Sequence, residues 1–391
     1  MKRERQVISL NGEWSCAMDP DGEASSDEWA KALPNPQTVA IPHRWEDFEA
    51  TQGYEGVLWY SRTITFPAKV GSSGVLLNLE NPIGLTDVYF DGTLIGHFFG
   101  NGLTHRIRAH GEPGTQHLIV IRLDSRNVPR AIKRAVSCGL GPISMEILPP
   151  VRIDFLSTTT TPTAPNTCTL RYRISADEST PVTMRIDIGK TILHKTLSFT
   201  VPIGATNGEF QFQIRDLKRW SASSPNTYSL RAILKDANQN TIDTYQLRYG
   251  CCQAALNNEH RLVINGVPTI LRGLRVPGGL PALSKQTITA MFAHEVSLAK
   301  DACFNAFMAD GATLSEQLLD IADEQGIFII ADIPPTLQPS NEDDATYTPD
   351  ITAVVEELGH HPSIIAWSWT SQQTPSTELA ELHKIDPSRI A

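Results

Sequence analysis

The sequence predicts a multidomain chain in which two β-sandwiches precede a segment of alternating strands and helices. Short stretches that alternate apolar and polar residues recur from residue 6 to about residue 250, as half-buried strands do. Beyond about residue 258, short apolar runs alternate with runs of helical spacing, which is typical of parallel βα units. A chain of 391 residues, 41% of them hydrophobic, is long enough to form two or three separate cores.

The first predicted domain, residues 1–148, is a jelly-roll β-sandwich. Its clearest signal is "TDVYFDGTLIGHFFG" (86–100), which places an Asp91–Gly92 turn between two alternating apolar runs. Such a dipeptide between alternating runs is a strong hairpin signal. Further strands are predicted over residues 56–66, 74–80 and 116–124. Short strands at this spacing are typical of sandwiches and jelly rolls.

The second predicted domain, residues 149–254, is an immunoglobulin-like β-sandwich. It contains "STTTTPTAPNT" (157–167), a Ser/Thr/Pro-rich stretch that we interpret as a loop or the edge of a linker. The region of about a hundred residues has room for seven or so short strands, which suggests an immunoglobulin-like sandwich, and five alternating stretches are clear in it. They are "CTLRYRIS", "VTMRIDIG", "GEFQFQI", "TYSLRAILKD" and "DTYQLRY".

The third predicted domain, residues 255–391, is a partial (β/α) barrel of about four βα units. Strands are expected at "TILRGL", "FNAFMA", "GIFIIADI" and "SIIAWSWT", and helices after Ser284 and over residues 314–325, 349–359 and 376–385. Gly326 is a suitable C-cap for the second of these helices. A closed (β/α)₈ barrel needs about 250 residues, whereas 133 follow residue 258. We therefore expect the N-terminal half of a TIM-type barrel, which is open, completed by another chain, or part of a truncated product.

Composition argues against several classes of function. The formal net charge of −10 disfavours nucleic acid or an anionic membrane as the main partner. A basic cluster is interpreted as a solvated loop rather than a phosphate site; it comprises Arg122, Arg126, Arg130, Lys133 and Arg134. Because no secretion signal or run of about 18 apolar residues is found, we expect a cytoplasmic location.

Cysteine and histidine spacing predicts no disulfide framework, no metal site and no cofactor. The six cysteines form no C-x-x-C pair, which fits a reducing compartment. Cys251 and Cys252 are interpreted as strand-core thiols rather than a redox or metal pair. His360 and His361 are adjacent, but no third ligand lies at helical or hairpin spacing from them.

Several motifs in serial order make the chain resemble glycoside hydrolase family 2, which contains the β-galactosidases, β-glucuronidases and β-mannosidases. The quoted motifs are "SLNGEW" (9–14), "IPHRWED" (41–47), "YEGVLWYSRTITFP" (54–67), "LVINGVPTILRGL" (262–274), "ADEQGIFIIADIP" (322–334), "HHPSIIAWSW" (360–369) and "KIDPSRIA" (384–391). The resemblance implies a jelly-roll sugar-binding domain over residues 1–148, an immunoglobulin-like domain and a (β/α)₈ barrel. It also implies O-glycosyl hydrolase chemistry within carbohydrate metabolism.

The same resemblance shows departures at the catalytic positions. The family's acid/base glutamate follows an asparagine after the fourth barrel strand, and Ser371 and Gln372 stand there in this sequence. Glutamine has the shape of glutamate but does not exchange a proton at neutral pH. The family's nucleophile lies beyond strand five, where this sequence ends, and its arginine after strand two falls at Met308. The resemblance therefore implies a protein that is non-catalytic alone, a pseudoenzyme with a carbohydrate-binding or assembly role.

Two acidic residues keep a hydrolase alternative open. Asp310 and Asp332 follow or end predicted strands, at the face where barrel sites form. They are either carboxylates of a catalytic site or ordinary partners of backbone amides and cations. Activity by this route requires those acids, or a second chain that completes the barrel, which is either another copy in a homo-oligomer or a partner chain.

Aromatic residues are the remaining candidates for binding a saccharide. Trp367 and Trp369 share one face of a predicted strand, where they either stack on sugar rings or fill the core. The candidate ligand-binding residues are Asp310, Asp332, Trp367, Trp369 and Gln372. In the first domain, we expect Trp14, Trp45, Trp59 and Tyr60 to pack at a domain interface. The sequence does not identify the sugar.

Overall fold

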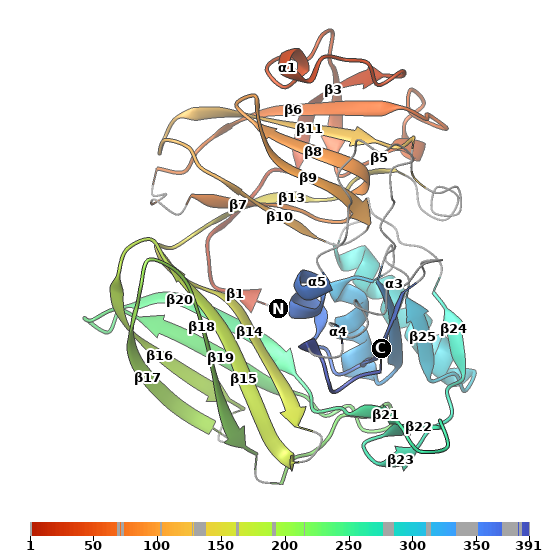
Figure 1. Cartoon of the computed structure of the whole chain (residues 1–391). Helices are drawn as coiled ribbons and strands as arrows, with labels where there is room; N and C mark the ends of the chain where they lie inside the picture. The colour runs from red at the N-terminus through yellow and green to blue at the C-terminus, as the bar shows by residue number, and fades with distance from the viewer. Residues whose placement is uncertain are drawn as a thin grey trace.

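The chain is arranged as two β-sandwiches and a smaller α/β segment (Figure 1). The computed structural model describes residues 2–68, 71, 74–101, 104–126, 128, 138–161, 164–189, 193–214, 216–276, 285–309, 314–333, 351–369, 382 and 385–390. The mostly β architecture with few helices agrees with the fold class that the sequence predicts. The boundaries at residues 148 and 254 stay predictions.

The first sandwich packs an eight-stranded sheet against a four-stranded one. The larger sheet contains β4 (Gln37–Ile41), β3 (Gly12–Asp19), β6 (Val57–Thr65), β11 (Gln116–Asp124), β8 (Ile83–Phe90), β9 (Thr93–Asn101), β12 (Gly139–Leu140) and β5 (His43–Arg44). The smaller contains β10 (His105–Ala109), β7 (Val75–Leu79), β13 (Ile143–Ile147) and β2 (Val7–Ser9). The Asp91–Gly92 turn has φ of 49° and 78°, the positive values that a type I′ hairpin requires. This confirms the predicted hairpin.

The aromatic residues of the first sandwich form its own core. Trp14, Trp45 and Tyr60 belong to one apolar cluster and Trp59 to a second, and all four are at most 2% exposed. Every member of both clusters lies between residues 8 and 147. The prediction that these rings pack at a domain interface is therefore wrong, because Trp14, Trp45 and Tyr60 pack inside the sandwich. Trp59 packs on the other face of the larger sheet, against Trp29 of α1 (Ser26–Trp29).

The second sandwich contains a five-stranded and a three-stranded antiparallel sheet. The first contains β1 (Lys2–Arg3), β20 (Thr241–Tyr249), β19 (Tyr228–Lys235), β16 (Thr180–Ile188) and β17 (Leu193–Val201). The second contains β14 (Val151–Thr161), β15 (Ala164–Ala176) and β18 (Gly204–Gln213). β1 pairs with β20, so the N-terminal residues join a strand that lies more than 240 residues away in sequence (Figure 1).

The Ser/Thr/Pro-rich stretch at 157–167 forms strand rather than the predicted loop. β14 extends to Thr161 and β15 begins at Ala164, so the stretch is the tip of a long hairpin. Threonine is β-branched and favours the pleated backbone. Its β propensity therefore outweighs the turn signal of the prolines.

The α/β segment contains four parallel strands, which confirms the predicted succession of βα units. The strands, in spatial order, are β24 (Gly273–Arg275), β25 (Ala306–Ala309), β26 (Phe328–Ile333) and β27 (Ile364–Trp369). The helices are α3 (Lys285–Asp301), α4 (Glu316–Gln325) and α5 (Ile351–Leu358). A small antiparallel sheet precedes them, consisting of β21 (Ala254–Leu256), β22 (Leu262–Ile264) and β23 (Val267–Pro268). That this segment is half of a TIM-type barrel stays a prediction.

Local sequence explains how α4 begins and ends. The hydroxyl oxygen of Ser315 accepts a hydrogen bond from the backbone N–H of Leu318, and Gly326 adopts φ of 74° after the last turn. These are the usual N-cap and left-handed C-cap arrangements, and the second was predicted. Ser284, the cap predicted for α3, and the predicted helix over 376–385 lie mostly outside the described residues.

Arginines of both sandwiches hold the α/β segment through acidic residues on its helices. Arg106 of the first sandwich lies 2.8 Å from Glu357 on α5. Arg173 of the second sandwich lies 2.7 Å from Glu356, and Arg248 lies 2.6 Å from Glu324 on α4. Helices α4 and α5 consequently lie against the β domains (Figure 1).

The basic cluster is partly explained by ion pairs. Arg122 bonds to Asp87 and Asp124, and Arg126 bonds to Asp124. Arg130, Lys133 and Arg134 lie outside the described residues. Among the described helices, none is long and apolar enough to cross a bilayer.

Candidate functional site

The candidate site lies where the parallel strands end at their carboxyl termini. Asp332 on β26 and Ser368 on β27 are register partners. The Ser368 hydroxyl donates a hydrogen bond of 3.1 Å to Asp332 Oδ1, and Asp332 is 4% exposed. Asp332 therefore already has a protein partner, which is a serine hydroxyl rather than the backbone amide or cation of the simpler sequence interpretation.

Strand alternation separates this polar pair from the helix-facing core. Ile329, Ala331 and Ile333 pack in the apolar cluster that also contains residues of α3, α4 and α5. Because neighbouring residues of a strand face opposite sides, Asp332 faces away from the helices. The face it shares with Ser368 is the one that would form the interior of a barrel.

Trp367 faces the helices rather than the interior. It is 3% exposed, and its Nε1–H donates a hydrogen bond of 3.0 Å to Asp386. Burial alone would raise the pKa of Asp386, but the Arg389 charge and hydrogen bonds from Trp367, Ser388 and Arg389 lower it. Trp367 thus has a core position with a satisfied indole N–H. The strand backbone at Trp369 is described, but its side chain is not.

Three other candidates lie outside the described residues. They are Asp310, Ser371 and Gln372. Of the five predicted ligand-binding residues, the structure therefore locates the side chains of Asp332 and Trp367, on opposite faces of the sheet. Their roles in ligand binding stay predictions.

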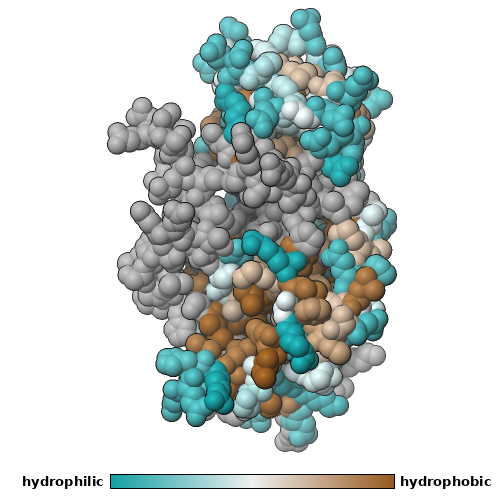
Figure 2. All heavy atoms as spheres, turned by 90° about the vertical axis from the view of Figure 1, so that its right-hand side faces the viewer, coloured by the Kyte–Doolittle hydropathy of each residue, from teal (hydrophilic) through white to brown (hydrophobic). Residues whose placement is uncertain are grey.

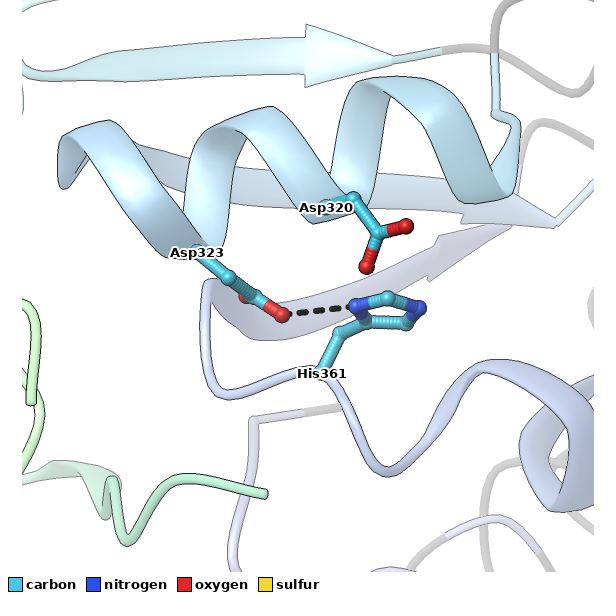
Figure 3. A group of neighbouring side chains, drawn as sticks. All are labelled: Asp320, Asp323 and His361. Atoms are coloured by element: carbon cyan, nitrogen blue, oxygen red, sulfur yellow. Dashed lines mark hydrogen bonds and ion pairs between the residues drawn. The ribbon is translucent and has the colours of Figure 1, made fainter. Parts of the chain in front are cut away.

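A buried histidine–carboxylate cluster, which the sequence did not reveal, braces β27. His361 from the preceding loop and Asp320 and Asp323 from α4 point toward one another (Figure 3). His361 Nδ1 lies 2.7 Å from Asp323 Oδ2, and both side chains are fully buried. The other Asp323 oxygen accepts a hydrogen bond of 3.0 Å from the Ser363 backbone N–H. The i,i+3 spacing of the two aspartates was the available signal, but their closeness to His361 depends on the fold.

The geometry of this cluster is that of a hydrogen-bonded brace. The His361–Asp323 contact is a direct bond at 2.7 Å, a normal hydrogen-bond length. Asp320 lies 4.0 Å from the Arg248 guanidinium of the second sandwich. Next to it, burial lowers the pKa of His360 well below its usual value, so that imidazole is neutral at pH 7. The cluster therefore joins α4 to the loop that precedes β27. We assign it a structural role and no part in the chemistry of the candidate site.

An apolar surface lies beside the strands β24 and β25. Figure 2 views this side of the molecule and shows a broad hydrophobic area on its lower half. Leu274 on β24 is 39% exposed and Met308 on β25 is 36% exposed. Val267 and Ile270, which precede β24, are 63% and 80% exposed.

Comparisons with known proteins agree in fold and family. Residues 151–251 match the family model "Glycosyl hydrolases family 2". A β-glucuronidase of Paenibacillus borealis is 22% identical over 429 residues, which cover 94% of this chain and 68% of that protein.

Solved structures extend the similarity over nearly the whole chain. A Bacteroides uniformis β-glucuronidase 2, covalently bound to cyclophellitol-6-carboxylate aziridine, matches with a TM-score of 0.79 and 16% identity. The match covers 99% of this chain and 52% of that chain, so this chain spans about half its length. A β-galacturonidase from Eisenbergiella tayi bound to galacturonate matches with a TM-score of 0.76 and 18% identity, over 98% of this chain and 70% of that chain.

Proposed function

Because the chain belongs to glycoside hydrolase family 2, we propose that it binds a uronate-type saccharide at the C-terminal edge of its parallel sheet without cleaving it. One observation carries this proposal. The four described parallel strands contain a single carboxylate, Asp332. Retaining glycoside hydrolysis needs two carboxyl groups roughly 5–5.5 Å apart.

The chemistry of the neighbouring positions supports a non-catalytic role. Asp332 is buried and accepts a hydrogen bond from the Ser368 hydroxyl. It is therefore placed to hold β26 and β27 together. By resemblance, Gln372 occupies the acid/base position, and its amide does not transfer a proton at neutral pH. Losing general acid–base help costs about 10²–10⁴-fold in rate.

The names of the similar proteins and the positive charge of an exposed arginine both favour a uronate as the ligand. The similar proteins are named β-glucuronidases and a β-galacturonidase. Arg275 is exposed at the C-terminal end of β24, on the edge where barrel sites form. A guanidinium suits a carboxylate because it offers two parallel N–H donors. Arg275 is therefore the described residue we assign to the uronate carboxylate.

Paired binding and turnover measurements test the proposal. We expect glucuronate or galacturonate to bind in calorimetry, and Arg275→Ala to weaken that binding. Leu274→Ala, a neighbouring exposed substitution on the same strand, is the matched control and leaves the carboxylate contact intact. Aryl β-glucuronides and β-galacturonides should release no nitrophenol. Nitrophenol release that disappears in the Asp332→Asn variant would contradict the proposal. The absence of any uronate binding would contradict it as well.

A second candidate function is hydrolysis by a barrel completed with further strands. Ile390 forms an isolated parallel bridge with Ala366 of β27, so the backbone at residue 390 lies beside the fourth strand. On the other side, β24 has no neighbouring strand among those described, and unpaired edges invite strand addition. This candidate expects aryl glycoside cleavage when the protein is mixed with a polypeptide carrying the later barrel strands. No cleavage in that mixture counts against it.

A further inference from the structure

A second concave site lies at the amino-terminal edge of the parallel sheet, opposite the edge that carries Asp332. It is a pocket of about 560 Å³, a volume within the range of small-molecule sites. Its walls include Lys300 at the end of α3 and Asn305 and Gly326, which come shortly before β25 and β26. Because these strands are parallel, the residues before them share one edge of the sheet. We propose that this pocket binds a small molecule that carries a phosphate group.

Three segments from distant parts of the chain form the pocket. They are residues 219–223 between β18 and β19, residues 264–272 before β24, and the C-terminal ends of α3 and α4. Figure 1 shows β22 and β23, which belong to the second segment, below the parallel strands. Gly326 and Ala222 lie so close that a Cβ atom on Gly326 would clash with the Ala222 carbonyl oxygen. A ligand held by all three segments would therefore fasten the α/β segment to the second sandwich.

The charged side chains that line the pocket are all cations. They are Arg219, Arg272 and Lys300, and no described lining residue is an aspartate or a glutamate. The chain as a whole has a net charge of −10, so this local excess of positive charge departs from its composition. Like charges in one pocket repel each other, and an anion bound between them offsets that repulsion. The lining therefore favours an anion over a neutral or cationic ligand.

Arg272 and Lys300 keep hydrogen-bond donors that a ligand can reach. Arg272 Nε–H donates to the Cys303 carbonyl oxygen at 2.7 Å, and Lys300 Nζ donates to the Gln325 carbonyl oxygen. These bonds hold both side chains at the ends of α3 and α4, and neither cation forms an ion pair with a described carboxylate. Both residues are exposed. The two Nη groups of the guanidinium and two N–H donors of the ammonium therefore remain for a ligand.

The asparagines of the pocket are committed to the protein backbone. Asn265 accepts a hydrogen bond of 3.0 Å from the Gln253 N–H and donates one of 2.8 Å to the Trp220 carbonyl oxygen. Asn305 likewise accepts from one backbone N–H at 2.7 Å and donates to one carbonyl oxygen at 2.9 Å. A saccharide needs neutral donors and acceptors, and these two amides already use their groups elsewhere. The cations are consequently the main donors that the pocket offers to a ligand.

A phosphate group fits these donors better than a carboxylate does. A phosphate monoester carries a charge of about −1.5 to −2 at pH 7 and three acceptor oxygens. A guanidinium binds two of those oxygens with parallel N–H groups, and an ammonium adds a compact charge. Val267, which is 63% exposed, and Phe304 supply an apolar wall for the organic part of the ligand. Phenyl phosphate should therefore bind more tightly than inorganic phosphate.

Protection of Cys303 reports binding at this place, because Cys303 lines the pocket and is exposed. The rate of its alkylation by iodoacetamide, a neutral reagent, is measured by mass spectrometry at fixed pH. Phenyl phosphate should slow the reaction in a saturable way, and inorganic phosphate should do so at higher concentration. Sodium chloride at equal ionic strength and sodium glucuronate at equal concentration should give little protection. Equal protection by glucuronate, or no protection by either phosphate, overturns the proposal.

Two pairs of substitutions show whether the pocket itself binds the phosphate. Arg272→Gln should raise the Kd for phenyl phosphate about tenfold or more, because a charge-assisted hydrogen bond is lost. Arg261→Gln is its control, since the Arg261 side chain is 74% exposed and does not line the pocket. Val267→Asp adds a negative charge to the exposed wall and should abolish protection, whereas the uncharged Val267→Asn should retain it.

Protection that survives Val267→Asp, or that is equally strong in Arg272→Gln and Arg261→Gln, also overturns the proposal. The Val267 pair keeps the backbone bonds of Arg272 and Lys300 in place, so its outcome does not depend on a change in folding. Uronate binding at the opposite edge of the sheet is measured separately by calorimetry. Its result is independent of these variants, so failure of the phosphate proposal leaves the proposed function standing.

Discussion

Arg5 and Asp243 form a buried bidentate pair across 238 residues of sequence. Arg5 Nη2 lies 2.7 Å from Asp243 Oδ2, and Arg5 Nε lies 3.0 Å from Oδ1. Arg5 also bonds to Glu146 of the first sandwich at 2.8 Å and to the Ile153 carbonyl. One side chain therefore connects the N-terminal arm, the end of the first sandwich and both sheets of the second.

Replacing Arg5 should strongly destabilise the protein. Arg5→Ala would remove the cation bound bidentately to the Asp243 carboxylate and one ion pair of Glu146, and these two side chains are 0% and 8% exposed. Removing one partner of a buried ion pair costs about 3–5 kcal/mol. We expect a loss of this size in the free energy of unfolding, which urea denaturation measures. Arg231→Ala is the control, because Arg231 and Glu4 are 41% and 46% exposed and such pairs contribute about 0–1 kcal/mol. Equal losses in both variants would contradict the prediction.

The pair of Asp386 and Arg389 predicts a stability that depends on acid pH. The pKa of Asp386 is lowered in the folded state, because Arg389 and its hydrogen bonds outweigh the opposing effect of burial. A lowered folded pKa contributes stability above the unfolded value of about 3.9, and that contribution disappears as pH falls through the folded pKa. Asp386→Asn should therefore lower the melting temperature at pH 7 more than at pH 3. Asp47→Asn, in a solvent-exposed pair with Arg44, should show little difference between the two pH values.

The α/β segment shows how far local patterns predict the fold. Continuous apolar residues over 326–333 and the C-cap signal at Gly326 place β26 and the end of α4 correctly. These signals are local, since period, caps and turn residues act within a few positions. The hairpin at 157–167 was missed because proline and serine suggested a turn, whereas its pairing depends on contacts with β18 further along the chain.

The candidate sites were harder to predict because they depend on tertiary contacts. The brace between Asp323 and His361 joins residues 38 apart, and the pair of Asp332 and Ser368 joins residues 36 apart on two neighbouring strands. Trp367 shows the same difficulty. The alternation of side chains along a strand predicts which face of the sheet Trp367 occupies, but not whether helices cover that face. Its bond to Asp386 identifies it as a core residue only in the folded chain.

Thiol reactivity should distinguish one cysteine from the other five. Cys303 is exposed, whereas the other five cysteines are buried, and none of the six forms a disulfide. The buried ones are Cys16, Cys138, Cys168, Cys251 and Cys252. Burial raises the pKa of Cys252 to about 12, which reduces the reactive thiolate. A disulfide reagent should modify one thiol quickly in the native protein and six after denaturation. Cys303→Ser should remove the fast phase, and a fast phase that persists in this variant would show that a buried thiol is accessible.

Gly326 should tolerate no side chain, because two constraints coincide there. Its φ is 74°, and a Cβ atom would lie 2.3 Å from the Ala222 carbonyl oxygen in the segment that leads from the second sandwich. Gly326→Ala therefore adds a backbone clash to the cost of a left-handed conformation, and together these should destabilise the fold by roughly 2–4 kcal/mol. Gly53→Ala is the matched control, since Gly53 has φ of 67° but no atom within 4 Å of the added Cβ. It should lose only about 1 kcal/mol in urea unfolding. A similar loss in both variants would mean that the C-terminus of α4 moves away from Ala222 at little cost, so that this contact does not hold the α/β segment against the second sandwich.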